Sequence, residues 1–535
     1  MSDRYDGKPL GALIAGVEGG RWSRRRVLQG AVASGAALGA ASLWRPGQAE
    51  AGTPKRGGIF RVGLHDANTA DTLDPATANG EFTVEMAYAI RNCLTEILPD
   101  GTVVGELAEG WEASSDAAQW TFTLREGITF HNGKPLTAAD VRDSLLYHLG
   151  EDSKSGGKAL LATVTDIKAD GNKVIITTSS GYADLPYALA DFHFTVCPSD
   201  GAGKIDVSGP GTGPYVVEMF EAGVGADLTR NPNYFKDGRA HFDGVKFLAI
   251  NDPAARANAL LTDEVDAISD IELKTARLFA QQDEVVIDDV PSGAHATLPM
   301  DMRVAPFDNH DVRMALKLAI DRQGAVDRAL RGFGSIGNDQ PISPSMPYYT
   351  PLPQREYDPE KAKHHLKKAG LDSLKVTLSA ADSAFNGAVD LAVLYSEDAK
   401  KAGIDIEVKR EPNDGYWSNV WMKKPFVVST WSARPTPDVM FSTAYKSGAD
   451  WNESRFSNER FDKLLAEAKS ELDNVKRTEL YHEMMQIVRD DGGVVIPFFR
   501  NRVMGRRTNV EHEAKISGIS PLDGSRAAER WWFAS

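Results

Sequence analysis

The sequence predicts a multi-domain α/β protein. Strand-like and helix-like patterns alternate along its 535 residues, a length that corresponds to roughly three domains. The apolar content of 42% is enough to bury a full core, and no short internal repeat occurs that would indicate a solenoid. These observations favour several mixed strand-and-helix domains over a repeat protein.

Three segments of the first half carry strand patterns. Residues 57–63 predict an early strand after a flexible start. Trp120, Phe122 and Leu124 alternate with threonines, which is typical of a strand buried on one face. The β-branched run 173–178 predicts another strand.

Helices are predicted where apolar residues recur at helical spacing behind a capping residue. Thr137 is the expected N-cap of a helix that runs to Leu149, with Asp140 as its capping-box acid. Asp308 or Asn309 is expected to cap a later helix. The stripes that predict the later helices are Val312, Ala315, Leu316, Ala319 and Ile320; Phe461, Leu464, Leu465, Ala468 and Leu472; and Leu480, Met484, Ile487 and Val488.

Charge and cysteine content exclude several classes of protein. The net charge is −15, without the basic excess expected of a nucleic-acid binder, so no nucleic-acid partner is expected. Cys93 and Cys197 are the only cysteines and lie far apart, which excludes a disulfide scaffold and a cysteine zinc site. Whether the two thiols pair is left open, since either state suits an oxidising compartment.

The first 51 residues predict an export signal. Arg24, Arg25 and Arg26 precede an apolar stretch, 30–43, which is shorter than the ~18 residues of a membrane span and fits a signal peptide. The arginines resemble a twin-arginine signal, and 49–51 is a small-x-small cleavage site. Because no cysteine lies near that site, we expect a periplasmic protein without a lipid anchor. The alternative is a chance arginine run before a buried helix.

Catalytic and metal-binding signatures are absent from the sequence. His482 lacks a second histidine one turn on, where Gln486 stands, so this segment is interpreted as a surface helix face. The adjacent His364 and His365 diverge on a helix, and His512 is interpreted as a residue of a solvated loop. No Gly-x-Ser-x-Gly motif occurs. We therefore expect no enzymatic activity, no resident cofactor and no metal.

Gly209, Gly211 and Gly213 stand in a run of glycine and proline. Their spacing is not that of a dinucleotide fingerprint, and the lysine of a phosphate loop is missing. They predict a tight turn between domains.

Segments along almost the whole chain, from about residue 57 to 500, resemble one family in the right order. The family is the peptide/nickel-type solute-binding proteins of ABC importers, extracellular solute-binding family 5. The matching segments are 57–58, 73–75, 105–111, 120–127, 130–141, 211–215, 230–235, 307–322, 357–362 and 369–370. Most of these residues are expected to be structural; Trp111, Tyr215 and Phe235 are interpreted as core residues.

The resemblance implies a two-lobe periplasmic binding protein fold with an extra domain, of the type II, large peptide-binding-protein class. Crossings near Pro299 and Pro497 would form the hinge between the lobes. The implied parts are the signal peptide at 1–51, the first lobe at 52–92, 208–298 and 497–535, the additional domain at 93–207, and the second lobe at 299–496.

The family also implies a role. A monomeric protein would close its lobes around a small organic solute, peptide-like, opine-like or otherwise acid-bearing, and deliver it unaltered to an ABC permease of the inner membrane. Two alternatives are a nickel or metal-chelate binder of the same family and a secreted enzyme or chaperone on the same fold.

The resemblance assigns ligand contacts residue by residue. Asn79, Gly80 and Glu81 match a segment that lies along the ligand in peptide-binding relatives. Trp417 matches an aromatic residue that covers the ligand. Three residues after a tryptophan, here Trp431, the family places an aspartate that pairs with the ammonium of a peptide.

Arg434 occupies that aspartate position. A buried guanidinium facing an ammonium would be repelled and unpaired, whereas its planar fork suits a carboxylate, phosphate or sulfate. We therefore predict an anionic or zwitterionic solute whose acid group contacts Arg434. Alternatively, Arg434 faces away and pairs with Asp438 or another acid, or Asp438 takes the ammonium role. Trp417 and Trp431 could also simply pack between helices.

Overall fold

The computed structural model describes residues 54–279 and 281–534. The predicted signal peptide, 1–51, lies outside the described residues. These described residues belong to one unit, whose core is divided among several sheets with their own clusters of buried side chains. None of the helices in the described ranges combines the length and the apolarity needed to cross a bilayer.

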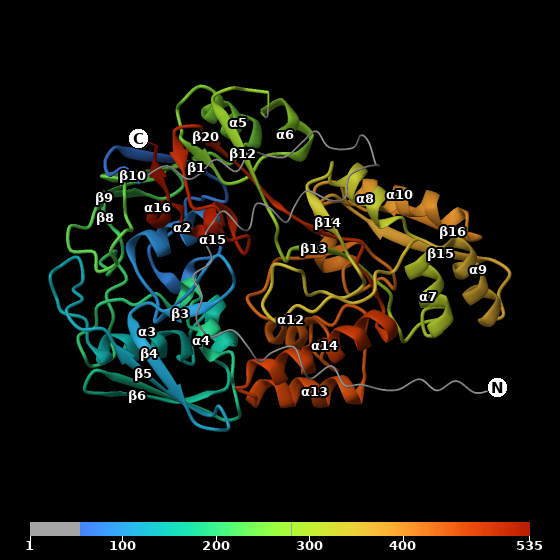
Figure 1. The fold of residues 1–535 in the computed structure, drawn as a ribbon, viewed down its shortest axis with the longest axis horizontal. Coiled ribbons are helices and arrows are strands. Elements are labelled where there is room, and N and C mark those ends of the chain that lie inside the picture. The colour runs from blue at the N-terminus through green and yellow to red at the C-terminus, as the bar shows by residue number, and fades with distance from the viewer. Residues whose placement is uncertain (1–53, 280, 535) are drawn as a thin grey trace, which may run out of the picture. The chain divides into compact units, whose positions relative to one another are not determined.

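A seven-stranded sheet surrounds the strand that the sequence predicts at 57–63. The strand order is β12-β20-β11-β1-β10-β9-β8, and β1 pairs in parallel with β10 and β11. Phe60, Val62 and Leu64 of β1 are buried in a cluster with side chains of α2, α15 and α16. The helices α5 and α6 lie at the top of Figure 1 and contribute to a separate cluster. The elements are β1 Ile59–Leu64, α2 Glu81–Ile90, β8 Tyr215–Glu221, β9 Gly225–Arg230, β10 Gly244–Ala249, α5 Pro253–Leu261, β11 Ala267–Ile268, α6 Leu273–Phe279, β12 Val285–Val290, β20 Arg502–Arg507, β21 Val510–Glu511, α15 Pro521–Ser525, α16 Ala527–Arg530 and β22 Trp532–Phe533.

A four-stranded sheet, β4-β5-β7-β6, packs against α3. The predicted strands at 120–124 and 173–178 are confirmed, and Trp120, Phe122 and Leu124 point to the buried face. The predicted helix start is also confirmed, because the Asp140 carboxylate accepts from the Thr137 N–H at 2.9 Å and from its hydroxyl at 2.6 Å. The elements are β2 Thr95–Ile97, β3 Val103–Gly105, β4 Ala108–Ala113, β5 Gln119–Leu124, α3 Ala138–Leu149, η2 Gly156–Leu161, β6 Val164–Asp170, β7 Lys173–Thr178, α4 Leu185–Ala188 and η3 Phe192–Phe194, with η1 Pro75–Thr77 preceding α2.

The segment between β12 and β20 builds a five-stranded sheet, order β14-β19-β13-β17 with β18 on β13, and a parallel pair, β15-β16. Figure 1 shows these strands with α7 to α14, in yellow to orange-red. The elements are β13 His295–Pro299, α7 His310–Leu318, α8 Arg322–Ala329, β14 Gly334–Ile336, α9 Pro359–Lys368, β15 Leu374–Ala380, α10 Ala388–Lys400, β16 Ile404–Arg410, α11 Tyr416–Asn419, β17 Ser429–Trp431, α12 Pro437–Ala444, α13 Glu459–Ser470, α14 Asn474–Asp491, β18 Val494–Val495 and β19 Phe498–Arg500.

The predicted helical stripes match α7, α13 and α14. Asn309 is the cap of α7, since its side chain accepts from the Asp311 N–H at 2.9 Å. Leu472 was wrongly included in the α13 stripe: the helix ends at Ser470, and Leu472 is exposed. Spacing alone extended the pattern past the end of the helix.

The chain passes between the seven-stranded and five-stranded sheets twice. It crosses at 291–294, between β12 and β13, and at Asn501, between β19 and β20. These crossings lie a few residues from Pro299 and Pro497, near which they are predicted; Pro299 is the last residue of β13 and Pro497 lies between β18 and β19. Both prolines therefore belong to the five-stranded sheet.

The structure shows the surroundings of the predicted glycine turn and the state of the two cysteines. A Cβ at Gly213 would lie 2.3 Å from the carbonyl carbon of Ile90, so the predicted tight turn packs directly on the end of α2. Cys93 and Cys197 are both free and buried, which answers the open question of their pairing.

The interpretation of His512 as a solvated loop residue is wrong. Its side chain is only 13% exposed, and its Nε2 lies 3.2 Å from Asp288. Its ring centroid lies 5.0 Å from that of Trp531. The flanking glutamates predict a solvent-exposed side chain, but His512 packs against Trp531 and is largely buried.

Candidate ligand-binding site

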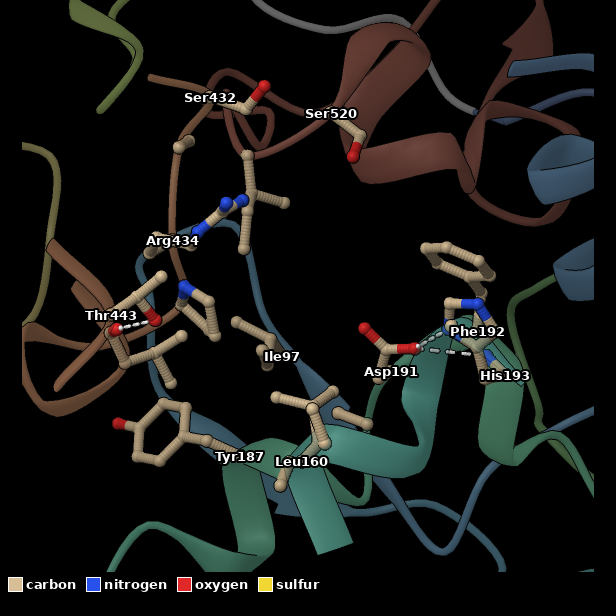
Figure 2. A pocket seen from close by; sticks show the side chains of 18 of the residues that line it. Ile97, Leu160, Tyr187, Asp191, Phe192, His193, Ser432, Arg434, Thr443 and Ser520 are labelled. Carbon is tan, nitrogen blue, oxygen red and sulfur yellow. Dashed lines mark hydrogen bonds and ion pairs between the residues drawn. The ribbon is translucent and has the colours of Figure 1, made fainter. Parts of the chain in front are cut away.

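A cavity of about 980 Å³ is lined by segments that are far apart in the sequence. Its walls come from the start of α2, from residues 156–193, from residues 432–451 and from residues 502–530. Figure 2 shows Arg434 and Thr443 on one side of the cavity and Asp191, Phe192 and His193 on another. Such a volume suits a small organic molecule.

Four of the predicted contact residues line this cavity: Asn79, Gly80, Glu81 and Arg434. Gly80 is the residue before α2, and a Cβ there would lie 2.8 Å from the Asp66 carbonyl oxygen. This close approach fixes where α2 begins and brings Glu81, its first residue, to the cavity wall.

Trp417 and Trp431 do not line the cavity. Trp417 lies on α11 and packs edge-to-face on Trp421, with ring centroids 5.7 Å apart. Trp431 is buried in β17, and its Nε1 donates to Glu453 at 3.0 Å. The alternative interpretation, that these rings pack inside the protein, describes Trp431, while Trp417 is 43% exposed.

Asp438 does not line the cavity either. It is buried in the first turn of α12, where Lys469 Nζ lies 2.8 Å from its carboxylate and the Ser442 hydroxyl donates to it at 3.0 Å. Its charge is therefore already matched within the protein, and the alternative in which Asp438 pairs with Arg434 is not observed.

Arg434 has no carboxylate partner among the described residues. Its guanidinium lies 5.6 Å from the centre of the Trp431 ring. Burial lowers its pKa from the ordinary arginine value, and the more distant charge of Asp191 opposes this shift. Asp191 accepts instead from His193 Nδ1, at 2.6 Å.

Sequence reasoning missed most of the cavity wall, including Trp451 and Arg502. Trp451, half exposed, lies in a loop where no periodic pattern marks it. Arg502 begins β20, directly after the second crossing. No sequence signal marks Arg502, because Arg500, Arg506 and Arg507 stand close to it in the chain.

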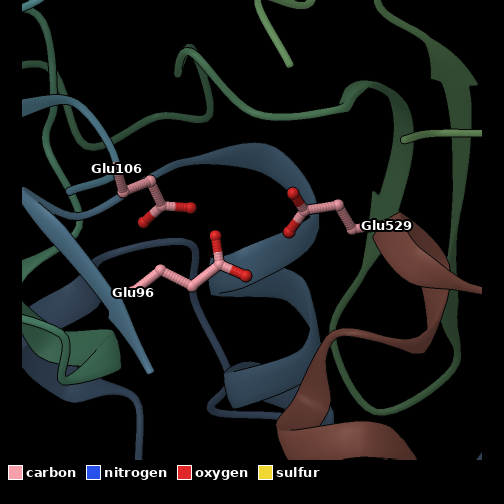
Figure 3. A group of neighbouring side chains, drawn as sticks. All are labelled: Glu96, Glu106 and Glu529. Atoms are coloured by element: carbon pink, nitrogen blue, oxygen red, sulfur yellow. The ribbon is translucent and has the colours of Figure 1, made fainter. Parts of the chain in front are cut away.

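A cluster of three acids lies near the cavity and has the composition of a metal site. Carboxylate oxygens of Glu96, Glu106 and Glu529 all lie within 4.8 Å of one another (Figure 3). Lys236 Nζ lies 2.6, 2.6 and 2.8 Å from these three side chains. A lysine ammonium thus occupies the position of a cation, and the cluster is a buried ion-pair network.

Residues 102–453 match the family described as bacterial extracellular solute-binding proteins, family 5 Middle. The chain belongs to this family. Among curated relatives, it is 27% identical over 465 residues to "Probable D,D-dipeptide-binding periplasmic protein DdpA" of Escherichia coli, covering 82% of this chain and 88% of the relative. It is 26% identical over 446 residues to the glutathione-binding protein GsiB of Salmonella typhi, covering 78% and 84%.

Solved structures confirm the predicted two-lobe periplasmic binding protein fold. The binding protein AgaA of A. tumefaciens, in complex with agropinic acid, superposes with a TM-score of 0.70 at 23% identity and covers 89% of this chain and 99% of its own. DppA of Helicobacter pylori, in complex with the peptide STSA, gives 0.70 at 21% identity and covers 90% and 99%.

Proposed function

We propose that this protein is the periplasmic solute-binding component of an ABC importer and that it captures an acid-bearing organic solute through Arg434. The observation that carries the proposal is a mostly buried arginine that lines the cavity without a carboxylate partner among the described residues. A buried guanidinium without an anion is costly. A carboxylate or phosphate from the solute would supply the missing charge.

Named relatives support this class of ligand. A D,D-dipeptide, glutathione and agropinic acid each carry at least one carboxylate. The closed state would be favoured because a solute that contacts several walls of the cavity binds that state more tightly.

Further parts of the proposal follow from the family role. The protein acts as a monomer, performs no chemistry on the solute, binds no nucleic acid and hands the solute to a membrane permease. Residues 1–51 direct export by the twin-arginine route without lipid anchoring. The lobe boundaries proposed are 52–92, 208–298 and 497–535 for the first lobe, 93–207 for the additional domain, and 299–496 for the second lobe.

A metal chelate is the second candidate solute. The chain is 26% identical over 456 residues to the nickel-binding periplasmic protein of Escherichia coli. In the cavity, His193 is held by Asp191, a carboxylate–histidine pair of the kind that orients metal ligands.

The test is calorimetric titration with a panel of acidic dipeptides, glutathione, neutral sugars and a nickel–histidine chelate. We expect an acid-bearing compound to bind most tightly and Arg434→Met to weaken it at least tenfold, about 1.4 kcal/mol. Arg303→Met, which alters an exposed arginine, is the control. Unchanged affinity in Arg434→Met contradicts the proposal, and tightest binding of the nickel chelate favours the second candidate.

A further inference from the structure

Glu81 lines the cavity and has one unsatisfied carboxylate oxygen. Its Oε2 lies 2.7 Å from His65 Nε2, and the side chain is only 6% exposed. Its Oε1 is buried and has no hydrogen-bond partner. A buried carboxylate oxygen in this state is expected to gain from a donor brought by a ligand.

Arg502 has the opposite charge and likewise lacks hydrogen-bond partners. It lines the same cavity, its Nε is buried without a partner, and no side chain or carbonyl in the described ranges accepts from its guanidinium. Burial lowers the pKa of Arg502, and the charges of Asp270 and Glu81 oppose that shift. Glu81 and Arg502 are therefore electrostatic neighbours that do not bond each other directly.

We propose that Glu81 and Arg502 form a subsite for a zwitterionic headgroup, with the ligand's ammonium on Glu81 Oε1 and its carboxylate on Arg502. This inference rests on the proposed function, in which Arg434 binds a separate acid group. The substrate class is then an acidic amino-acid derivative with one ammonium and two acid groups.

The donor and acceptor counts fit this headgroup. An ammonium offers three donors, one of which satisfies Oε1, and a guanidinium fork donates to two carboxylate oxygens side by side. A dicationic ligand would leave both Arg434 and Arg502 unpaired. A simple diacid would leave Glu81 with its unsatisfied oxygen facing a second negative charge.

The experiment compares matched ligands on the unmodified full chain. Glutathione, alanyl-glutamate and glutamate are each titrated beside the analogue that lacks only the amino group. We expect the best-binding zwitterion to bind at least tenfold more tightly than its des-amino analogue, because only the zwitterion satisfies Glu81.

Variants then assign the effect to the subsite. Glu81→Gln is expected to abolish the preference for the zwitterion while leaving the affinity of the des-amino analogue within about twofold. Glu85→Gln is the matched control, since Glu85 lies one turn along α2, is buried and does not line the cavity. Arg502→Gln is expected to weaken both analogues at least tenfold.

The outcomes separate the two proposals. Suppose that acid-bearing compounds bind, but that each zwitterion and its des-amino analogue bind with equal affinity, or that Glu81→Gln weakens the binding of both alike. The zwitterion subsite is then wrong, while the proposed function stands. If no panel compound of any class binds at millimolar concentration, the proposed function itself is contradicted. Should Glu81→Gln fold poorly, the paired analogues on the unmodified chain and Arg502→Gln still decide.

Discussion

The arginines of the cavity wall differ in how their charge is balanced. Arg526 and Arg530 each bond a buried glutamate of the network around Lys236, at 2.8 and 2.6 Å. Arg434 and Arg502 line the same cavity and have no such partner within the described chain. Because buried glutamates neutralise the first two arginines, the proposal assigns the second two to acid groups of the ligand.

Of these residues, only Arg434 could be predicted from sequence. It stands where a family pattern expects an aspartate, so a single substitution reversed the sign of the charge. Arg502 and Trp451 follow no pattern, and their position depends on the three-dimensional course of β20 and of the loop after α12. Trp417 and Trp431 match family positions, but neither lies in the cavity wall.

His65 pairs with Glu81 and gives the stability of the protein a pH dependence. Burial alone would lower its pKa, but the bonds to Asp66 and Glu81 outweigh burial and raise the pKa of His65 to about 10. Since the folded-state pKa exceeds the ordinary value, this stabilisation is complete below about pH 6.5 and is lost as pH rises toward 10.

We accordingly predict that His65→Gln lowers the free energy of unfolding by about 2 kcal/mol at pH 6 and that the loss shrinks between pH 6.5 and 10. Urea denaturation at several pH values measures it. His364→Gln, which removes an exposed histidine, should change little. A deficit that is constant with pH would show that His65 contributes only packing.

At the scale of elements, local signals were predicted well. The start of α3 and the bounds of β7 depend on neighbouring residues, namely a capping box and a β-branched run. Where an element ends depends on contacts with other parts of the chain. Apolar spacing alone does not show these contacts, so the predicted stripe of α13 continues past Ser470 to Leu472.

The turn around Gly213 depends on a close contact with the end of α2. A methyl group there would meet the Ile90 backbone at 2.3 Å, a contact that cannot be relieved by rotating a side chain. We expect Gly213→Ala to lower the free energy of unfolding by at least ~2 kcal/mol. In Gly110→Ala nothing lies within 4 Å of the new carbon, so thermal denaturation of this control should match the parent. Equal melting temperatures for both variants would disprove the packing argument.

At the scale of the whole molecule, the four-stranded-sheet region contacts the last two helices before β18. Asp184 and Arg477 form a buried ion pair there, and the Ala183 N–H donates to the Lys469 carbonyl at 2.7 Å. Sequence could not predict this contact, because nothing in either segment signals a partner almost three hundred residues away.

Removing one member of this pair leaves the other charge buried. We predict that Arg477→Met lowers the free energy of unfolding by about 3 kcal/mol, measured by urea denaturation. Arg460→Met, on the neighbouring helix, breaks an exposed pair with Glu483 and should leave the unfolding midpoint unchanged. If both variants unfold alike, Asp184 must find solvent or another donor in the folded protein.

The ion-pair network around Lys236 also has a consequence for synthesis. Glu96 and Glu106 lie in the first fifth of the chain, while Arg526 and Arg530, which neutralise them, are among its last ten residues. Until the ribosome has released residues 526–530, these two buried glutamates have only Lys236 as a counter-ion, which leaves one negative charge unmatched. The packing around Glu96 and Glu106 is therefore completed only after residues 526–530 have been made, and a variant that lacks these residues would keep an excess negative charge in its interior.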